Sequence, residues 1–179
     1  MVNVIEQSLK DYTTYNELNI ISDGVCDNNG NLYPDFDKFI ANLFTSKIFN
    51  GDTLASCDTL LIAKNKNHII FVEFKDMNSL NSEKDIKNWW KNKFRSIYLK
   101  ITDSILSLSY LLALKKYSQN HDDFMNLSKS FFYVYKSDSY KNKIKNHLKY
   151  KFSRYSFLFE NIRIVETKSF EKFLASNGL

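Results

Sequence analysis

Glycine and proline are scarce in this chain, with four Gly and one Pro among 179 residues. Long disordered linkers are rich in such residues and poor in aromatic ones. Here aromatic residues make up 16% of the sequence and apolar residues 44%. A chain of this length and apolar content can bury a substantial core. We therefore expect one folded domain that spans residues 1–179.

Cysteine is also rare, and long apolar runs are missing. Cys26 and Cys57 form no Cys-x-x-Cys pair and have no His cluster near them, which favours reduced structural thiols over a disulfide or a zinc site. No stretch approaches the roughly 18 apolar residues of a membrane span. The first 20 residues carry acids and no apolar core, so they are not expected to form a signal peptide. The sequence thus predicts a cytoplasmic protein with no membrane segment.

The charge of the chain is unevenly distributed. Residues 1–60 contain nine acidic and three basic residues, a balance of −6, whereas the whole chain has a net charge of +5, so residues 61–179 carry +11. Such an asymmetry indicates a polyanionic partner for the second part of the chain. An ordinary Lys-rich surface that only keeps the protein in solution is the alternative.

Hydrophobic periodicity predicts a mixed α/β domain with a small sheet flanked by helices. Apolar residues recur at helical spacing between Phe36 and Ile48, after a capping Asp35. Residues 53–63 and 68–74 have the length and composition of strands, with KNKN as the hairpin connection. The other expected elements are a weak helix at 3–18, a long helix at 83–117, a strand at 131–135, a basic helix at 139–152, a strand at 162–166 and a terminal helix at 168–176.

Three charged residues interrupt the two apolar strands of the segment CDTLLIAKNKNHIIFVEFKD, which runs from Cys57 to Asp76. Glu73 and Lys75 are two positions apart, so they point to the same face of the second strand. In the natural hairpin register Asp58 lies near them at the same sheet edge. Carboxylates held together repel each other, and Mg²⁺ relieves that repulsion because it takes oxygen ligands, usually one or two carboxylates. The pattern predicts a metal site at Asp58 and Glu73, with Lys75 placed to position water or neutralise charge.

The alternative for these residues is a surface Glu–Lys pair on an edge strand, with Asp58 capping a turn. However, Asp58, followed after fourteen residues by Glu73-Phe74-Lys75 in an apolar strand, resembles the PD-(D/E)XK nuclease superfamily over about residues 36–135. The resemblance implies a restriction-endonuclease-like core with Lys75 as the catalytic lysine. It also implies Asp58 and Glu73 as metal ligands, assisted by the main-chain carbonyl of Phe74. Residues 1–34 are then an N-terminal extension, and residues 136–179 add the basic helix, a strand and a helix.

Three features differ from the family pattern. Cys57 replaces the Pro that usually precedes the Asp. Many members carry an acid on the helix before the strands, and the candidates here, none in an obvious position, are Asp37, Glu6 and Glu17. The family core has three strands before the long helix, where this sequence has two clear ones. Either residues 51–63 form a bent strand with a double role, or a short strand near residues 19–22 completes the sheet.

Two basic segments are candidates for holding a nucleic acid. The first follows steps of three and four along the long helix, and the second has six bases and no acid. Their residues are Lys84, Lys87, Lys91 and Arg95 in the first, and Lys141, Lys143, Lys145, Lys149, Lys151 and Arg154 in the second. Tyr150 and Phe152 lie between the bases of the second segment, and phosphate contacts with aromatic stacking suit a nucleic-acid strand.

Other interpretations of these segments stay open. The first segment also fits a solvated helix face, and the second fits a basic amphipathic helix that binds a membrane or an acidic protein. Lys100 and Asp103, on the same long helix, are expected either to pair locally or to supply a polar group to the active site.

These expectations favour a Mg²⁺- or Mn²⁺-dependent endonuclease that hydrolyses phosphodiester bonds, in DNA rather than RNA, in restriction, phage defence or mobile-element biology. The first alternative is a catalytically weak or inactive nuclease-fold protein that binds another protein, as immunity-type or regulatory proteins do. The second alternative is a nucleic-acid-binding module without chemistry. Because many nucleases that cut both strands are dimers, a homodimer is left open.

Overall fold

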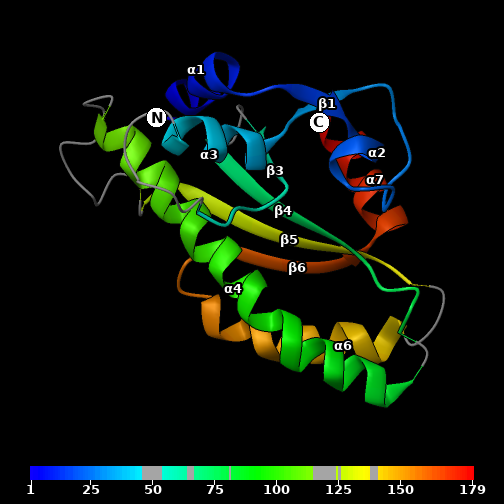
Figure 1. Cartoon of the computed structure of the whole chain (residues 1–179). Coiled ribbons are helices and arrows are strands. Elements are labelled where there is room, and N and C mark those ends of the chain that lie inside the picture. The colour runs from blue at the N-terminus through cyan, green and yellow to red at the C-terminus, as the bar shows by residue number, and fades with distance from the viewer. Residues whose placement is uncertain (46–53, 64–66, 81, 115–123, 125, 138–140) are drawn as a thin grey trace.

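The computed structural model describes residues 1–45, 54–63, 67–80, 82–114, 124, 126–137 and 141–179 of the chain. Its helices and strands alternate along the sequence (Figure 1). In chain order they are α1 (Val2–Tyr12), β1 (Tyr15–Glu17), α2 (Leu18–Ile21), β2 (Leu32–Pro34), α3 (Phe36–Thr45), β3 (Thr59–Ala63), β4 (His68–Asp76), α4 (Glu83–Leu114), β5 (Ser128–Lys136), α6 (Lys141–Phe152), a 3₁₀ turn (Ser153–Tyr155), β6 (Asn161–Glu166) and α7 (Thr167–Asn177).

A four-stranded mixed sheet with the order β3-β4-β5-β6 forms the centre of the fold. The pair β3 and β4 is an antiparallel hairpin, whereas β5 runs parallel to β4 and β6 runs parallel to β5. The strands β1 and β2 form a separate small antiparallel sheet. The domain is therefore a mixed α/β fold whose central sheet begins with a hairpin and continues through two parallel connections.

Helices cover both faces of the central sheet. The two parallel connections pass through α4 and α6, and successive crossovers of the usual right-handed sense that advance in one direction place their helices on the same face. Figure 1 shows α4 running diagonally across that face with α6 beside its first half. The residues of α1 and α3 join the same apolar cluster, whereas α2 and α7 contribute to the cluster on the opposite face.

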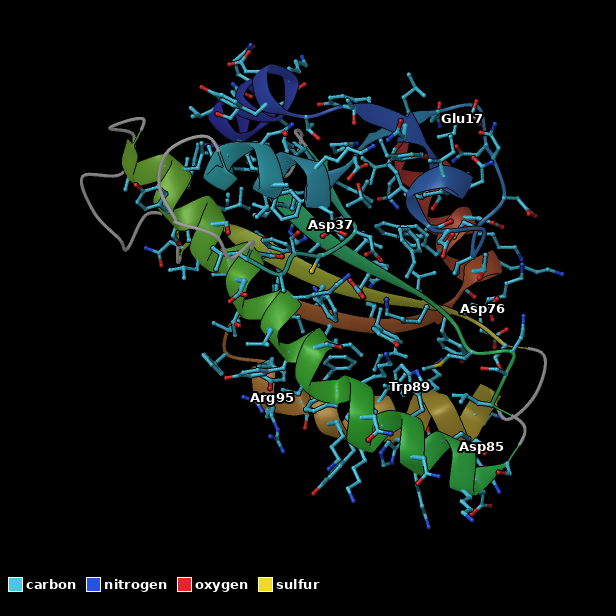
Figure 2. All side chains as sticks on the ribbon, in the orientation of Figure 1. Glu17, Asp37, Asp76, Asp85, Trp89 and Arg95 are labelled. Carbon is cyan, nitrogen blue, oxygen red and sulfur yellow. The ribbon has the colours of Figure 1, made fainter. Side chains whose placement is uncertain are left out.

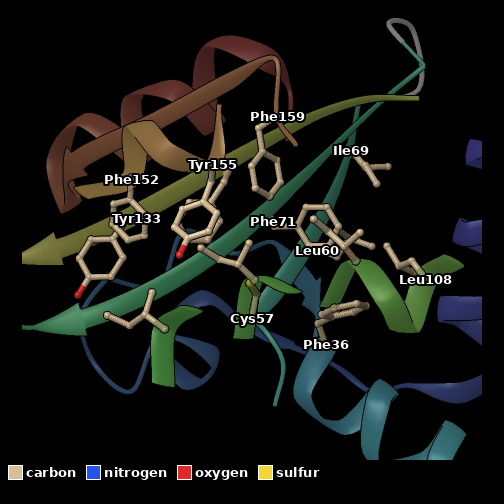
Figure 3. Packing of buried hydrophobic residues seen from close by; sticks show 14 of the residues in the cluster. Phe36, Cys57, Leu60, Ile69, Phe71, Leu108, Tyr133, Phe152, Tyr155 and Phe159 are labelled. Atoms are coloured by element: carbon tan, nitrogen blue, oxygen red, sulfur yellow. The ribbon is translucent and has the colours of Figure 1, made fainter. Parts of the chain in front are cut away.

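Strand alternation divides the core between the two faces of the sheet. On the first face Phe71 packs edge-on against Phe36, and both are fully buried (Figure 3). On the second face Phe74 packs edge-on against Phe170 of α7. Residues of β4 that are an odd number of positions apart thus pack into opposite cores, as the two-residue period of a strand requires. Glu73 stands between Phe71 and Lys75 on the first face, so its carboxylate lies on the side covered by α4.

Most of the predicted elements are confirmed. The hairpin, the long helix, the strand at 131–135 and the last three elements all form, with bounds shifted by a few residues. Asp35 caps α3, since its Oδ1 accepts a hydrogen bond of 3.0 Å from the Lys38 amide. Ile48, the end of the long helix beyond residue 114 and most of the KNKN connection lie outside the described residues.

Neither expected route to a third strand of the central sheet before the long helix is confirmed, since β1 and β2 precede the hairpin but form a separate sheet. Residues 18–21 form the short helix α2, because Leu18 is buried while Ile20 is largely exposed, which is incompatible with one buried strand face. The predicted strand at 53–63 begins only at Thr59, and residues 54–57 form no strand. The weak helix at 3–18 ends at Tyr12, where β1 follows. The fourth strand of the central sheet is instead β6, from the C-terminal part of the chain.

Candidate functional site

The hairpin register places Asp58 beside Glu73. Thr59 pairs with Val72, and Asp58 precedes Thr59, so it stands opposite the next residue of β4, which is Glu73. The main chain of Asp58 is tied to α3, because its carbonyl accepts a hydrogen bond of 3.1 Å from the Phe36 amide. The two carboxylates that the sequence predicts to lie together are therefore neighbours at the start of β3.

One ammonium group bridges these two carboxylates. Lys100 Nζ, from the middle of α4, lies 2.9 Å from Asp58 Oδ1 and 3.1 Å from Glu73 Oε2. The Glu73 side chain has no exposed surface, whereas 15% of the Asp58 side chain and 22% of the Lys100 side chain are exposed. The carboxylates thus share a cation at the edge of a buried cluster, and that cation is a lysine side chain.

The other two carboxylate oxygens also have partners. Asp58 Oδ2 accepts a hydrogen bond of 2.7 Å from the Phe74 amide. Because the N–H and C=O of one residue point to the same side of an extended strand, the Phe74 carbonyl faces the edge where Asp58 lies. Glu73 Oε1 lies 2.8 Å from Lys75 Nζ, but it accepts no well-aligned hydrogen bond within the described residues. Lys75 is the most open member of the group, with 34% of its side chain exposed.

Burial and charge strongly shift the acid–base behaviour of this group. The pKa of Glu73 is raised to about 7, chiefly by burial and also by the neighbouring Asp58, while Lys100 and Lys75 act in the opposite direction. Burial alone would lower the pKa of Lys100, but Glu73 and Asp58 outweigh it and raise that pKa. The site therefore holds a carboxylate that is costly to ionise, next to an ammonium that stays charged.

Two further polar groups lie close to the carboxylates. Asp37, in the first turn of α3, accepts a short hydrogen bond from Ser56. Although Asp37 is an exposed residue as a whole, partial burial of its carboxyl raises its pKa, and Lys100 lowers it. The Tyr133 hydroxyl is buried with no hydrogen-bond partner among the described residues, and burial next to Glu73 and Asp58 raises its pKa well above the usual value.

Asp37 was a candidate from the sequence, whereas Tyr133 was not. Of the three candidate helical acids, Asp37 lies over the sheet near the site, whereas Glu17 lies towards the far end of the molecule and Glu6 pairs with Lys10 (Figure 2). Tyr133 was not predicted, although its alternation with Phe131 would have placed it on the same face as Glu73, its partner in the β4–β5 register.

The long helix also fixes the segment before Asp58. Asp103 Oδ2 accepts a hydrogen bond of 3.2 Å from the Ala55 amide, and the Ser104 hydroxyl accepts one of 2.9 Å from the Cys57 amide. Of the two roles expected for Lys100, the structure places its ammonium in the carboxylate site, while Asp103 holds the chain that leads into β3. One helix thus provides both the cation and the anchoring of the site.

The predicted nucleic-acid-binding residues lie on two helices that run side by side. Lys143 pairs with Glu83, Trp90 contacts His147, and Phe94 contacts Phe152, so the first half of α4 packs along α6. Almost all of the predicted bases are exposed; they are Lys84, Lys87, Lys91, Arg95, Lys143, Lys145, Lys149 and Arg154. Lys151 is half-buried, and the side chain of Lys141 lies outside the described part of the chain.

The two aromatic residues of α6 behave differently. Tyr150 is 75% exposed, with the Lys151 ammonium over its ring. Phe152 is fully buried against Phe131 and Tyr133, so the expectation that it lies among the bases as a stacking surface is wrong. The reason is helical spacing, since Phe152 lies one turn after the buried Leu148, on the inner face of α6.

A divalent cation suits the donor atoms of this site. The donors are carboxylates and a main-chain carbonyl, the hard oxygen ligands that Mg²⁺ prefers, and the buried Glu73 Oε1 lacks an aligned hydrogen bond. Within the described residues no group of three or more His, Cys, Asp or Glu side chains is arranged to hold a metal, so the protein offers two carboxylates. One or two carboxylates with water are the usual protein contribution to a Mg²⁺ site.

No protein-family model matches the chain, and neither a curated protein nor a solved structure matches it. None of the helices in the described parts has the length and apolarity that crossing a membrane requires. A pocket between α1, the small sheet and β3 is lined by Glu6 but by none of the charged residues of the carboxylate site. The candidate site is therefore defined by the convergence of charged side chains.

Proposed function

We propose that this protein is a metal-dependent nuclease of the PD-(D/E)XK type, with a restriction-endonuclease-like core, that hydrolyses phosphodiester bonds in DNA. The observation that carries the proposal is the convergence of Asp58, Glu73 and Lys75. The two carboxylates lie close enough together to contact the same cationic group. Asp37 on α3 and the helix α4 directly after the hairpin agree with the same pattern. The free buried thiols of Cys26 and Cys57 suit a cytoplasmic setting, where thiols stay reduced.

Each residue of the site has a distinct part in this reaction. Asp58 and Glu73, with the Phe74 carbonyl, would hold Mg²⁺ or Mn²⁺. When bound, such a cation stabilises charge on the phosphate and lowers the pKa of its water. Lys75, the most exposed of the charged groups, orients the attacking water and neutralises charge that develops on the phosphate. The biological setting that we propose, restriction, phage defence or mobile-element biology, rests only on where small single-domain members of that superfamily tend to be found.

One observation favours the alternative of a nuclease-fold protein that binds without cleaving. Lys100 and Lys75 already neutralise the two carboxylates, so the site is electrically balanced without a metal. A protein that has lost catalysis could keep such a cluster for structural reasons. Cleavage assays therefore decide between the two proposals.

The purified protein is expected to nick plasmid DNA or cut a labelled single strand when Mg²⁺ or Mn²⁺ is present, and EDTA is expected to abolish the cleavage. Asp58→Asn is the matched control, because it keeps the side-chain shape, removes the metal ligand charge, and exposes any contaminating nuclease. If the native protein cleaves neither DNA nor RNA with either metal, the binding-only alternative replaces the nuclease.

The basic faces of α4 and α6 are proposed to hold the phosphate backbone. Replacing both Lys145 and Lys149 with Ala is expected to weaken DNA binding by about tenfold and to reduce the salt dependence by about two ions, because each phosphate contact releases counterions. Tyr150→Ala is expected to weaken binding to single strands more than to duplexes, since unpaired bases stack on exposed aromatic rings. Fluorescence anisotropy of labelled duplex and single-stranded DNA, across a salt series, measures the affinity losses of the lysine variant and of Tyr150→Ala.

Lys172→Ala serves as the comparison for these variants, since Lys172 is an exposed base on α7, on the opposite face of the sheet. Unchanged affinity in the α6 variants would assign this helix to a solvated surface or to another partner.

A further inference from the structure

Lys100 occupies the position that both carboxylates share, although it comes from a different element of the fold. Its backbone is fixed, because Ile97 and Ile101 on either side are buried in the core and Ser104 binds the Cys57 amide. Its side chain is different, since a lysine ammonium ends a flexible four-carbon stem. With 22% of that side chain exposed, a route to solvent exists for the ammonium, whereas the Glu73 carboxylate has none.

The charges of the two paired carboxylates and the two lysines balance only while Lys100 is in place. Asp58 and Glu73 contribute two negative charges, and Lys75 and Lys100 contribute two positive charges within 3.1 Å of them. A divalent cation between the carboxylates would add two further positive charges and repel the nearest ammonium. Lys100 is the ammonium that touches both carboxylates, so it is the group that such a cation displaces.

We propose that Lys100 is a displaceable counter-ion, which closes the carboxylate pair in the metal-free protein and moves to the phosphate of the substrate when a divalent cation binds between Asp58 and Glu73. This inference rests on the proposed nuclease function and adds a regulatory step to it. The same ammonium serves two anions in turn, a carboxylate pair before metal binding and a phosphate after it.

The proposal couples metal binding to substrate binding. In the metal-free protein the Lys100 charge is held by the carboxylates, so it contributes nothing to phosphate binding. Once displaced, it adds a cation beside the site, on the same helix that carries the exposed bases Lys91 and Arg95. Lys100 lies five positions after Arg95, about 8 Å further along the helix axis. Mg²⁺ therefore strengthens nucleic-acid binding partly through Lys100.

Lys100→Met tests the proposal, because it keeps the apolar stem and removes the charge. Isothermal titration with Mg²⁺ alone, at about pH 8.5, is expected to show metal binding at least about tenfold tighter than in the native protein, since no ammonium has to be displaced. Lys100→Gln, which keeps a hydrogen-bond donor but no charge, is expected to give an intermediate affinity. The control is Lys93→Met, an exposed lysine of the same helix. Circular dichroism verifies that each variant is folded.

A second measurement uses a non-cleavable phosphorothioate DNA strand. Mg²⁺ is expected to increase its affinity for the native protein by a larger factor than for Lys100→Met, within the 5- to 150-fold range usual for coupled ligands. If Lys100→Met and Lys100→Gln bind Mg²⁺ no more tightly than the native protein, and the native protein still cleaves DNA, the displacement proposal is wrong and the nuclease function stands. If Mg²⁺ binds to none of the proteins and no cleavage occurs, both proposals fail.

Discussion

Replacing Lys75 with Met is expected to lower the rate of metal-dependent cleavage by about a hundredfold to a thousandfold, the scale of losing one preorganised electrostatic group in an active site. Lys75 is the only one of the four charged groups in the cluster whose side chain is more than a quarter exposed, so it is the one best placed to reach water and substrate. Glu73 keeps Lys100 as a partner in this variant, so the carboxylate site itself remains. Single-turnover cleavage of labelled DNA with Mg²⁺ measures the effect.

Lys172→Met is the control for this experiment, since it makes the same chemical change on α7, on the other face of the sheet. Magnesium binding by Lys75→Met should remain measurable by titration calorimetry, because both carboxylates are intact. A Lys75→Met protein that cleaves at the native rate would remove Lys75 from the catalytic group and leave it as a structural partner of Glu73.

The sequence was sufficient for the parts of the fold that have a local signal. The hairpin was recognisable because two apolar strands flank a polar turn, and alternation alone put Glu73 and Lys75 on one face. The long helix was recognisable from apolar residues repeated over many turns. The short elements at residues 15–21 were not, because a burial difference such as that between Leu18 and Ile20 depends on tertiary packing.

The candidate site divides in the same way. Asp58, Glu73 and Lys75 lie in one hairpin, so their proximity follows from a register. Lys100 and Asp37 reach the site from separate helices, and no spacing along the chain states how α3 and α4 pack on the sheet. Their signal was only a charged residue beside an apolar helical stripe, which most helices of this kind possess. The pairing of Lys100 with both carboxylates can be recognised only when β3, β4 and α4 are packed together.

Glu73→Gln is expected to stabilise the metal-free protein at pH 8, while it abolishes metal-dependent cleavage. The pKa of Glu73 rises from its ordinary value of 4.5 to about 7 on folding, chiefly because the carboxyl is buried. Between these values the folded state binds more protons than the unfolded state, so the free energy of unfolding falls as the pH rises through this window. Above pH 7 the full cost is present, about 3 kcal/mol for a shift of this size.

The amide of Gln removes this cost because it cannot ionise. The unfolding free energies of the two proteins should therefore be similar near pH 4.5 and should separate steadily up to about pH 8, which urea denaturation at several pH values measures. Glu17→Gln, on the small β1–β2 sheet, is the comparison for a glutamate outside the site. If the stability of the native protein does not fall relative to that of Glu73→Gln over this pH range, the conclusion that ionisation of the buried Glu73 destabilises the fold is wrong.

Magnesium should then reverse the order of stability at pH 8. A ligand that binds only the folded state stabilises it by mass action, so Mg²⁺ is expected to raise the unfolding free energy of the native protein and to leave that of Glu73→Gln nearly unchanged. A chain selected only for stability would place an apolar or amide side chain at the centre of β4. A buried acid that destabilises the metal-free protein, and whose cost a bound cation offsets, is the arrangement expected of a binding site. Function is often maintained at the expense of stability.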